Sequence, residues 1–190
     1  MKIFLVGYMY CGKTTVGKQL AKKLNSDFLD TDTMFETQYQ TSIADYFSKH
    51  GELAFRAAER QILEDLKTNS KDNVVISTGG GLPCFNNNMA LMRELGVVIY
   101  LEAPVGMIYR RFEKSNAQRP LLANLSKADA ICKIEQQLAE REPFYKQANI
   151  TVSAENVNFE ALLQILTINT SPNPSKGGEF PPFGGIKGGN

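Results

Sequence analysis

A glycine-bracketed loop near the N-terminus carries the strongest chemical signal in the sequence. The apolar run 3–6 leads into Gly7-x4-Gly12-Lys13-Thr14, and a helical pattern follows at once. The two glycines let the chain turn sharply and leave backbone N–H groups open to phosphate oxygens. Lys13 places a mobile cation on the β- and γ-phosphates of a nucleotide, and the Thr14 hydroxyl is a ligand for Mg²⁺. This spacing predicts a phosphate-binding loop between a strand and a helix; a glycine turn that merely caps a helix is the alternative.

Acidic residues and glycines follow two further predicted strands. Residues 30–32, Asp-Thr-Asp, end the short run 27–29, and residues 77–81, Ser-Thr-Gly-Gly-Gly, follow the β-branched run 74–76. The carboxyl ends of parallel strands meet at one edge of a sheet, where ligands bind. The run 74–76 does not end in Asp, so the second acidic metal ligand typical of nucleotide sites is missing there. Asp30 is therefore the candidate metal carboxylate, although it can equally cap the helix that follows.

A polar, irregular segment at about 115–127 supplies a further candidate. Arg119, followed by Pro120, can close over transferring phosphates and exclude water from them. A kinase needs that exclusion because it must phosphorylate a hydroxyl group instead of hydrolysing the nucleotide. Neither DxxG nor NKxD, the motifs typical of GTPases, occurs in the sequence. These features favour a small-molecule kinase, with simple solvation of a loop arginine as the alternative for Arg119.

The composition is that of one globular domain without a strong electrostatic signature. The chain has 190 residues, 43% of them hydrophobic, and a formal net charge of +1 at pH 7. That charge predicts neither nucleic acid nor a membrane surface as a partner. No stretch approaches the roughly 20 apolar residues of a membrane span, and the run 3–6 is too short for a signal peptide. We therefore expect a cytoplasmic, monomeric protein.

The cysteines and the single histidine form no recognisable ligand set. Cys11, Cys84 and Cys132 are far apart and lack CxxC spacing, so neither a disulfide framework nor a zinc site is predicted. His50, beside Gly51, is interpreted as a solvated residue at a helix end. Cys11 lies within the phosphate loop and is either a reactive thiol or a small side chain that fills the position.

Hydrophobic periodicity places strands and helices in alternation along the chain. Val16, Leu20 and Leu24 share one face of a helix, with lysines on the other face. Pro143 is predicted to end a helix that starts at Lys127. Such alternation predicts an α/β domain with a parallel sheet and helices on both faces. The predicted strands are 3–6, 27–29, 74–76, 97–101 and 150–152, and the predicted helices are 13–24, one from residue 31 or 32, 52–66, one within 85–95, 104–113, 127–142 and 159–168.

The C-terminal residues differ in kind from the rest of the chain. Residues 169–190 hold half of the chain's eight prolines and little that can be buried. We expect one domain of residues 1–168 and a disordered, Pro/Gly-rich tail of residues 169–190. A partner-binding arm within this tail is the alternative.

Taken in order, the motifs of the sequence resemble the shikimate kinase family from about Lys2 to Leu166. The resemblance implies ATP-dependent phosphorylation of the 3-hydroxyl of shikimate, in chorismate and aromatic amino acid biosynthesis. It also implies a three-layer P-loop kinase fold similar to that of nucleoside monophosphate kinases, with a five-stranded parallel sheet of order 2-3-1-4-5 and a mobile lid. The motifs are Gly7-x4-Gly12-Lys13-Thr14-Thr15-x-Gly17, Phe28-Leu29-Asp30-Thr31-Asp32, Ser42-Ile43-Ala44-Asp45, Gly51-Glu52, Phe55-Arg56-x-x-Glu59, Gly79-Gly80-Gly81, Arg119-Pro120-Leu121-Leu122 and Arg141-x-Pro143-x-Tyr145.

The resemblance also implies a role for each matching residue. Lys13, Asp32 and Arg119 are implied as catalytic, with Asp32 as the carboxylate that hydrogen-bonds the reacting hydroxyl. Mg²⁺ is the implied cofactor, with Thr14 and Asp30 as its ligands, and shikimate and ATP are the implied substrates. Arg111 is implied to lie near the adenine. The residues implied to bind ATP are Tyr10, Cys11, Gly12, Lys13, Thr14, Thr15, Arg111 and Arg119, and those implied to bind shikimate are Asp32, Arg56, Gly79, Gly80, Gly81 and Arg141.

The chemistry of the residue types agrees with the implied substrate. A planar guanidinium binds a carboxylate through two parallel hydrogen bonds, so Arg56 and Arg141 suit the carboxylate of shikimate. The glycines 79–81 let the backbone approach a polyhydroxylated ring. Arg56 can instead pair with Glu52 or Glu59 on a helix surface. Arg141 can simply complement a helix dipole.

Tyr10 is an unusual residue for its place in the phosphate loop, where relatives often have glycine. A positive φ there would cost a residue with a side chain about 1–2 kcal/mol. Ordinary dihedrals, with the ring turned away from the phosphates, are the alternative.

Two other functions remain open on sequence grounds. A gluconate kinase of the same fold is one, since gluconate also bears a carboxylate. A noncatalytic, kinase-like module is the other, and it would be expected to lack Lys13, Asp32 or Arg119, all of which are present.

Overall fold

The computed structural model describes residues 1–68, 73–115 and 125–170, with the side chains of residues 168–170 excepted. Arg119, most of the predicted lid and residues 171–190 of the predicted tail lie outside the described residues. The last helix continues through residue 170, so the tail prediction is wrong for residues 169 and 170.

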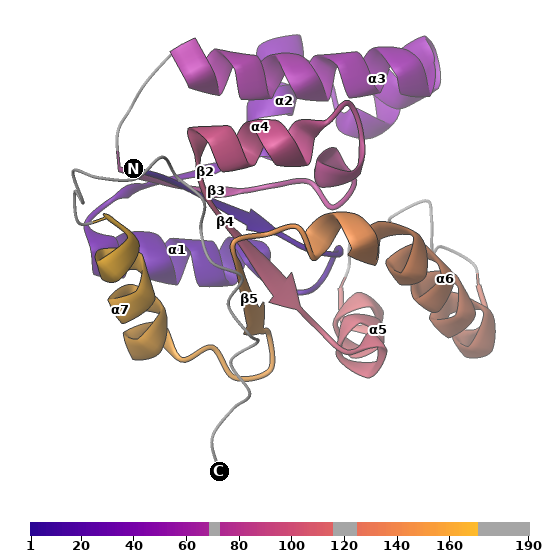
Figure 1. Ribbon diagram of the computed structural model, residues 1–190. Helices are drawn as coiled ribbons and strands as arrows, with labels where there is room; N and C mark the ends of the chain where they lie inside the picture. The colour runs from indigo at the N-terminus through magenta and orange to yellow at the C-terminus, as the bar shows by residue number, and fades with distance from the viewer. Residues whose placement is uncertain (69–72, 116–124, 171–190) are drawn as a thin grey trace.

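Five parallel strands form one sheet at the centre of the molecule (Figure 1). Their order is β2-β3-β1-β4-β5, which confirms the predicted order. β1 lies in the middle and pairs with β3 on one side and with β4 on the other. Parallel strands need a crossover between them, which the intervening helices provide. The strands are β1 Lys2–Val6, β2 Asp27–Asp30, β3 Val74–Ser77, β4 Gly96–Glu102 and β5 Ile150–Ser153.

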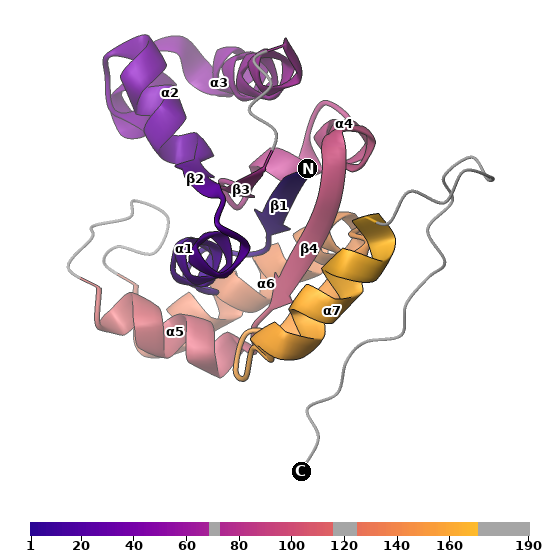
Figure 2. The ribbon, with the colours of Figure 1, turned by 90° about the vertical axis from the view of Figure 1, so that its left-hand side faces the viewer.

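The helical segments connect the strands much as the hydrophobic periodicity predicts. α2 and α3 lie together in one part of the molecule, and α5 and α6 lie together in another (Figures 1 and 2). The helices are α1 Lys13–Leu24, α2 Thr31–Tyr39, α3 Ile43–Thr68, α4 Asn88–Leu95, α5 Val105–Glu113, α6 Lys127–Tyr145 and α7 Phe159–Thr170, with a 3₁₀ turn, η1, at Leu82–Cys84.

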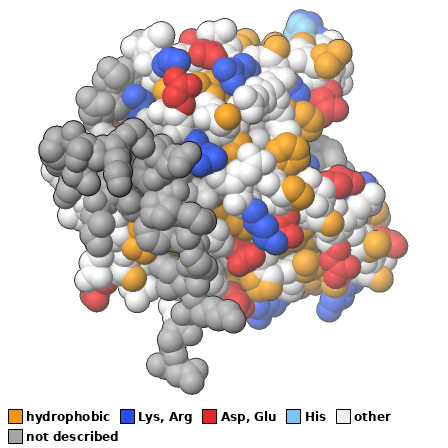
Figure 3. Space-filling view, in the orientation of Figure 1, with side chains coloured by type: hydrophobic (Ala, Val, Ile, Leu, Met, Phe, Trp, Pro, Cys, Tyr) orange, Lys and Arg blue, Asp and Glu red, His pale blue; other side chains and the backbone are white. Residues whose placement is uncertain are grey.

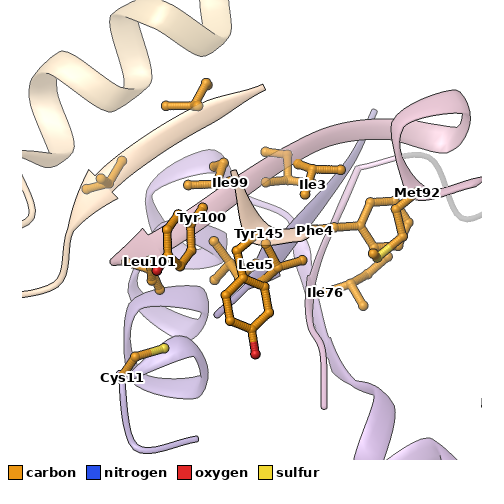
Figure 4. Close-up of a cluster of buried hydrophobic side chains, with 14 of the residues drawn as sticks. Ile3, Phe4, Leu5, Cys11, Ile76, Met92, Ile99, Tyr100, Leu101 and Tyr145 are labelled. Atoms are coloured by element: carbon orange, nitrogen blue, oxygen red, sulfur yellow. The ribbon is translucent and has the colours of Figure 1, made fainter. Parts of the chain in front are cut away.

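Helices cover both faces of the sheet because β1 is apolar on both sides. Successive side chains of a strand point to opposite faces. Leu5 faces α1, where a Cβ added to Gly17 would lie 3.0 Å from the Leu5 side chain. Phe4 points to the other face and lies beside Met92 of α4 (Figure 4). Every residue of β1 is buried, as expected for a strand between two helical layers.

The long helix α3 is broken at Gly51. This residue has φ 78° and ψ 175°, so two helical pieces meet there at a kink. Glycine adopts such a conformation readily because it has no Cβ. The first piece begins with a capping interaction, in which the Ser42 hydroxyl accepts the backbone N–H of Asp45 at 3.0 Å. The second piece carries Arg56 to the loop that follows β3.

The prediction that Pro143 ends its helix is wrong, since α6 continues to Tyr145. Proline lacks an N–H, so one backbone bond of the last turn is lost. The turn is nevertheless closed by the N–H of Lys146, which donates to the Glu142 carbonyl at 2.9 Å. Tyr145 is fully buried and its ring stacks on Tyr100 of β4, with centroids 5.2 Å apart (Figure 4). The packing of Tyr145 on β4 stabilises the last turn of α6 despite the hydrogen bond that Pro143 cannot make.

The surface shows mixed charge on the face drawn in Figure 3. Acidic and basic side chains are interspersed there and do not gather by sign, in agreement with the net charge of +1. Among the helices of the described ranges, none combines the length and the apolar character that a membrane crossing requires.

Candidate active site

The phosphate loop between β1 and α1 has the backbone geometry that its glycines predict. Gly7 has φ 141° and Gly12 has φ 105°, in a region that side chains rarely adopt. A Cβ on Gly7 would lie 2.7 Å from the Leu101 carbonyl oxygen, so this position also needs the missing side chain. The loop leads directly into the N-terminus of α1, where backbone N–H groups and the helix dipole favour an anion.

Tyr10 has a positive φ of 61°, so the alternative of ordinary dihedrals is wrong. This conformation costs about 1–2 kcal/mol. The Tyr10 ring lies edge-on to Phe112, next to the end of α5, with centroids 5.9 Å apart, and its hydroxyl accepts a hydrogen bond from Ser115 at 3.2 Å. An aromatic pair and a hydrogen bond each contribute about 0.5–1.5 kcal/mol. The side-chain contacts therefore offset the backbone strain.

The Lys13 ammonium is held against the loop. The residue is 8% exposed, and Nζ donates to the carbonyl oxygens of Gly7 and Tyr8, both at 2.9 Å. A buried ammonium needs such partners. Cys11 lies next to it, with Sγ 3.7 Å from the Lys13 Nζ, and is 1% exposed. Burial of Cys11 argues against a reactive thiol and for a small side chain that fills the position.

Three oxygen-bearing side chains meet beside the loop. The Thr14 hydroxyl donates to Asp30 Oδ2 at 3.1 Å and lies 3.4 Å from the Ser77 hydroxyl oxygen. Asp30 and Ser77 come together because they are opposite each other in the parallel register of β2 and β3. Asp30 Oδ1 also accepts the backbone N–H of Asp32 at 3.1 Å, so Asp30 caps α2 as well. The capping and the metal interpretations of Asp30 are therefore compatible.

This donor set fits Mg²⁺ better than a metal that needs an all-protein cage. Within residues 1–68, 73–115 and 125–170, no three His, Cys, Asp or Glu side chains cluster closely enough to hold a metal ion. Mg²⁺ prefers oxygen ligands and usually binds one or two carboxylates together with substrate phosphates and waters. One carboxylate and two hydroxyl groups beside a phosphate loop provide that chemistry.

A hollow of about 350 Å³ opens at the carboxyl ends of β1, β2 and β3. Asp32, in the first turn of α2, lies against Gly79, where an added Cβ would be 2.6 Å from Asp32 Oδ1. The lining of the hollow includes Lys13, Thr14, Thr15, Asp30, Asp32 and Gly80. The residues predicted to handle phosphate and the carboxylate predicted to meet the acceptor hydroxyl thus share one hollow.

Arg56 is held by two carboxylates and an aromatic ring. Nη1 donates to Glu59 at 2.6 Å, while Nε and Nη2 donate to one oxygen of Glu52 at 3.3 and 3.2 Å. The guanidinium carbon lies 4.0 Å from the centroid of the Phe85 ring. On the side of the glycine loop, a Cβ on Gly81 would lie 3.0 Å from Nη1. Arg56 therefore makes the ion pairs considered from sequence and also lies beside the glycine loop.

Of the two carboxylates that pair with Arg56, Glu59 is the one better shielded from solvent. Its side chain is 7% exposed, against 55% for Glu52. Exposed ion pairs contribute only about 0–1 kcal/mol, because water and salt screen them. Burial raises the pKa of the Glu59 carboxyl group, and the Arg56 guanidinium opposes that rise. We infer that Glu59 fixes one end of the guanidinium, whereas the contact with Glu52 is readily exchanged.

Arg141 reaches the site from α6, between two buried tyrosines. Its guanidinium carbon lies 5.5 Å from the centroid of the Tyr8 ring, and a Cβ on Gly80 would lie 3.7 Å from Nη1. The Tyr8 hydroxyl donates to Gln137 of α6 at 2.5 Å. The Tyr145 hydroxyl donates to the Gly80 carbonyl at 2.6 Å. α6 thus contacts both the phosphate loop and the glycine loop.

The groups beneath the glycine loop stay neutral near pH 7. Burial raises the pKa of the Tyr8 and Tyr145 hydroxyls, and it raises the pKa of the Cys84 thiol to about 11. The positive charge of Arg141 opposes each rise without cancelling it. Tyr8, Tyr145 and Cys84 therefore add no negative charge beside Arg141.

Arg111 lies directly on the phosphate loop. Nη1 donates to the carbonyl oxygen of Cys11 at 2.6 Å and to that of Tyr10 at 3.1 Å. A Cβ on Gly12 would lie 2.9 Å from the same nitrogen. These contacts are with the loop backbone, whereas the role implied for Arg111 is at the base of the nucleotide.

The sequence did not single out every residue of this site. Ser77 was missed as a partner of Thr14, although its place directly after a buried strand is a usable signal. Phe85 was missed as the ring beneath Arg56, and nothing in its sequence context points to that contact. Of the predicted site residues, Arg119 is the one outside the described ranges.

Comparisons with known proteins agree with this geometry. The shikimate kinase family model matches residues 9–168. A curated shikimate kinase from Azobacteroides pseudotrichonymphae is 39% identical over 165 residues, which cover 87% of this chain and 96% of the relative. A crystal structure of shikimate kinase from Bacteroides thetaiotaomicron aligns with a TM-score of 0.81 at 37% identity, covering 89% of this chain and 97% of the other. Shikimate kinase from Acinetobacter baumannii, solved in complex with shikimate, aligns with a TM-score of 0.76 at 32% identity, covering 89% and 94%. By sequence and by structure, the chain belongs to the shikimate kinase family.

Proposed function

We propose that the chain phosphorylates the 3-hydroxyl of shikimate with ATP, giving shikimate 3-phosphate and ADP in chorismate and aromatic amino acid biosynthesis. One observation carries the proposal: the phosphate loop and Asp32 line a single hollow, and Arg56 and Arg141 lie beside the glycine loop at its edge. Family membership supports the same reaction.

Asp32 is proposed to orient the acceptor hydroxyl and to take its proton. The proton passes to the Asp32 carboxylate as the oxygen bonds to the γ-phosphorus and the bond to ADP breaks. The transition state is loose, with little bonding to the acceptor, so positioning contributes more than base strength. Lys13 and the loop N–H groups would stabilise the charge on the phosphates.

Arg56 and Arg141 are proposed to bind the carboxylate of shikimate. Both guanidinium groups lie close to the Cα atoms of the glycine loop, Arg56 at Gly81 and Arg141 at Gly80. Asp32 lies against the third glycine, Gly79. A ring placed over this loop would therefore have its carboxylate near the arginines and a hydroxyl near Asp32.

Thr14 and Asp30 would hold Mg²⁺, with the Ser77 hydroxyl beside them. Bound there, Mg²⁺ would supply positive charge that offsets the negative charge developing on the transferring phosphate. Arg119, which lies outside the described residues, is proposed to contact the phosphates from the lid at about 115–127.

We further propose a cytoplasmic monomer in which residues 1–170 form the kinase domain. Cys11, Cys84 and Cys132 are free thiols, as in most proteins of a reducing compartment. The hollow and the arginines beside it are built from residues of this chain, which is compatible with the proposed monomer.

A coupled ADP-release assay with ATP and Mg²⁺ tests the reaction. Shikimate, quinate, gluconate and nucleoside monophosphates should be compared as acceptors. We expect turnover with shikimate far above the background without acceptor, and turnover with gluconate instead would establish the alternative kinase. Lys13→Ala should lower the rate by on the order of 10²-fold or more, as for the loss of a preorganised charge on the phosphates. No turnover with shikimate would overturn the proposal.

A further inference from the structure

The end of α5 and the phosphate loop are joined by four contacts that the proposed reaction does not use. Arg111 Nη1 donates to the carbonyl oxygens of Cys11 and Tyr10 at 2.6 and 3.1 Å. The Tyr10 ring lies edge-on to Phe112, with centroids 5.9 Å apart. Its hydroxyl accepts a hydrogen bond from Ser115 at 3.2 Å. All four join one short stretch of loop to residues that are 100 or more positions later in the chain.

The carbonyl contacts set the direction of the loop N–H groups. In a trans peptide, the C=O group and the N–H group of the next residue point in opposite directions. Arg111 holds the carbonyl of Cys11, so the N–H of Gly12 in the same peptide is turned away from Arg111. Gly12 lines the hollow in which the nucleotide phosphates are proposed to bind. The preceding peptide is held at both ends, because its N–H, that of Cys11, donates to the Tyr8 carbonyl at 3.3 Å.

The Tyr10 side chain explains how the loop keeps this geometry. A positive φ is unfavourable for any residue with a Cβ. The ring and hydroxyl contacts of Tyr10 with Phe112 and Ser115 hold the residue in that conformation. The backbone carbonyl that Arg111 binds therefore belongs to a residue already anchored on the same helix end.

We propose that Arg111 is a positioning residue for the phosphate loop and that Tyr10 anchors the loop on α5. The two residues fix the backbone of the loop that receives the triphosphate, including the orientation of the Gly12 N–H, so their effect does not depend on the base. Arg111 is exposed, which leaves its outer face accessible to other contacts. The inference rests on the proposed binding of a nucleotide by this loop.

Binding of ATP and of inorganic tripolyphosphate, each with Mg²⁺, separates this role from a contact with the base. Both ligands should be titrated calorimetrically into the full chain and into Arg111→Met, which keeps the side-chain length but has no N–H donors. We expect both affinities to fall by the same factor, about tenfold, as for the loss of charge-assisted hydrogen bonds. A loss confined to ATP would overturn the proposal and favour a contact with adenine.

Arg110 provides the matched control for the loss of charge. It precedes Arg111 on α5 and is exposed, and its Nε donates to the Gly106 carbonyl of its own helix at 3.3 Å. We expect Arg110→Met to change both affinities by less than about twofold, because an exposed charge that makes no contact with the loop is screened. Equal losses in the two variants would mean that charge alone, and not the contact, acts on the phosphates.

A double-mutant cycle tests the anchor. Tyr10→Phe removes one side of the Tyr10–Ser115 hydrogen bond. Ser115→Ala removes the other side, together with the 2.8 Å bond from Ser115 to the Phe112 carbonyl. Each should weaken both ligands by about two- to fivefold, and the double variant by no more than Ser115→Ala alone. Additive losses would contradict the anchor. Shikimate affinity, measured alone, should stay within about twofold in every variant, a result that a general loss of folding would not give.

The outcomes also separate this inference from the proposed function. If the wild-type chain binds neither ATP nor tripolyphosphate, the proposed nucleotide binding fails. If the wild-type chain binds both ligands and Arg111→Met binds them equally well, the positioning role alone fails.

Discussion

The glycine loop after β3 leaves no space between its backbone and the residues proposed to bind shikimate. A Cβ would lie 3.0 Å from Arg56 Nη1 at Gly81 and 2.6 Å from Asp32 Oδ1 at Gly79. Each neighbouring atom is the end of a flexible side chain, so it can move aside with little effect on folding. Substitutions at Gly79 and Gly81 are therefore expected to affect substrate binding more than stability.

Gly81→Ala tests the close approach of Arg56 to the glycine loop. The added methyl group should displace the Arg56 guanidinium and raise the shikimate KM by about tenfold, as for the loss of one charged contact. The ATP KM should stay within about twofold, because Arg56 lies away from the phosphate loop. Steady-state kinetics with each substrate varied in turn measures both constants.

Gly106→Ala is a suitable control for Gly81→Ala. Outside the backbone of α5 itself, no atom of the described residues lies within 4 Å of a Cβ at Gly106, so both KM values should match those of the wild type. A rise in the ATP KM of Gly81→Ala, with the shikimate KM unchanged, would contradict the placement of Arg56.

Burial of Glu59 predicts a dependence of stability on pH. Burial raises its pKa, so the folded state holds the proton more tightly than the unfolded chain does. The resulting stabilisation is present below the ordinary pKa of Glu, about 4.3, and is lost as the pH rises through the raised pKa. We expect the Tm of the wild type, relative to that of Glu59→Gln, to fall as the pH rises from about pH 4 through the raised pKa of Glu59.

Thermal unfolding of both proteins across that range is the measurement for Glu59. Glu52→Gln serves as a control, because Glu52 touches the same arginine from a position that is 55% exposed. A Tm difference that is constant, or that grows in favour of the wild type as the pH rises, would show that burial does not govern this carboxyl group.

At the scale of elements, α6 is the helix that joins the two loops of the site. Gln137, Arg141 and Tyr145 are spaced four residues apart and so lie on one face of the helix. They contact Tyr8 of the phosphate loop and Gly80 of the glycine loop. Loss of any one contact should loosen the end of the sheet where the site lies.

Tyr145→Phe tests this function of α6. The half-buried Gly80 carbonyl would lose its hydrogen bond from Tyr145, and one such bond contributes a net of about 0.5–1.5 kcal/mol. We expect a lower free energy of unfolding in urea, together with a raised shikimate KM, because the glycine loop loses its support. Tyr109→Phe is the matched control, since its hydroxyl donates to Glu113 of its own helix at 3.3 Å. Equal destabilisation in the two variants would argue against a special place for Tyr145.

The elements themselves were largely predictable, because their signals are local. The apolar runs and the 3.6-residue periodicity placed the helices to within a few residues. The last turn of α6 was not predictable, because its stability comes from the packing of Tyr145 on Tyr100 and not from the sequence around Pro143. The contact of Arg111 with Cys11 joins residues 100 positions apart, and no local pattern reports it.

At the scale of the whole molecule, the described fold covers most of the chain that the family model matches, residues 9–168. The family model ends at residue 168, and α7 continues through residue 170. Alternation of strands and helices predicted a parallel sheet, whereas the order of its strands came from the family resemblance. Periodicity cannot supply that order, because every strand buried on both faces carries the same apolar pattern.

A chain shortened to residues 1–170 tests the extent of the domain. Leu162 and Leu166 of α7 are each 1% exposed and belong to the core. We expect kcat and both KM values within about twofold of the full chain, since single domains tolerate the loss of residues outside their core. A chain that stops at residue 158 lacks both leucines and should unfold at a lower temperature. A large loss of activity at 1–170 would place residues 171–190 in the working enzyme.

The central position of β1 has a consequence for how the protein is made. Lys2 pairs with Val74 and with Gly96, so both neighbours of this strand are synthesised long after it. At about 5–20 residues per second, an apolar strand waits on the order of 5–20 s for its second partner. A nascent chain in that interval is open to aggregation and to chaperone binding. We therefore expect mutations that make this strand more prone to aggregate to lower the yield of protein during translation.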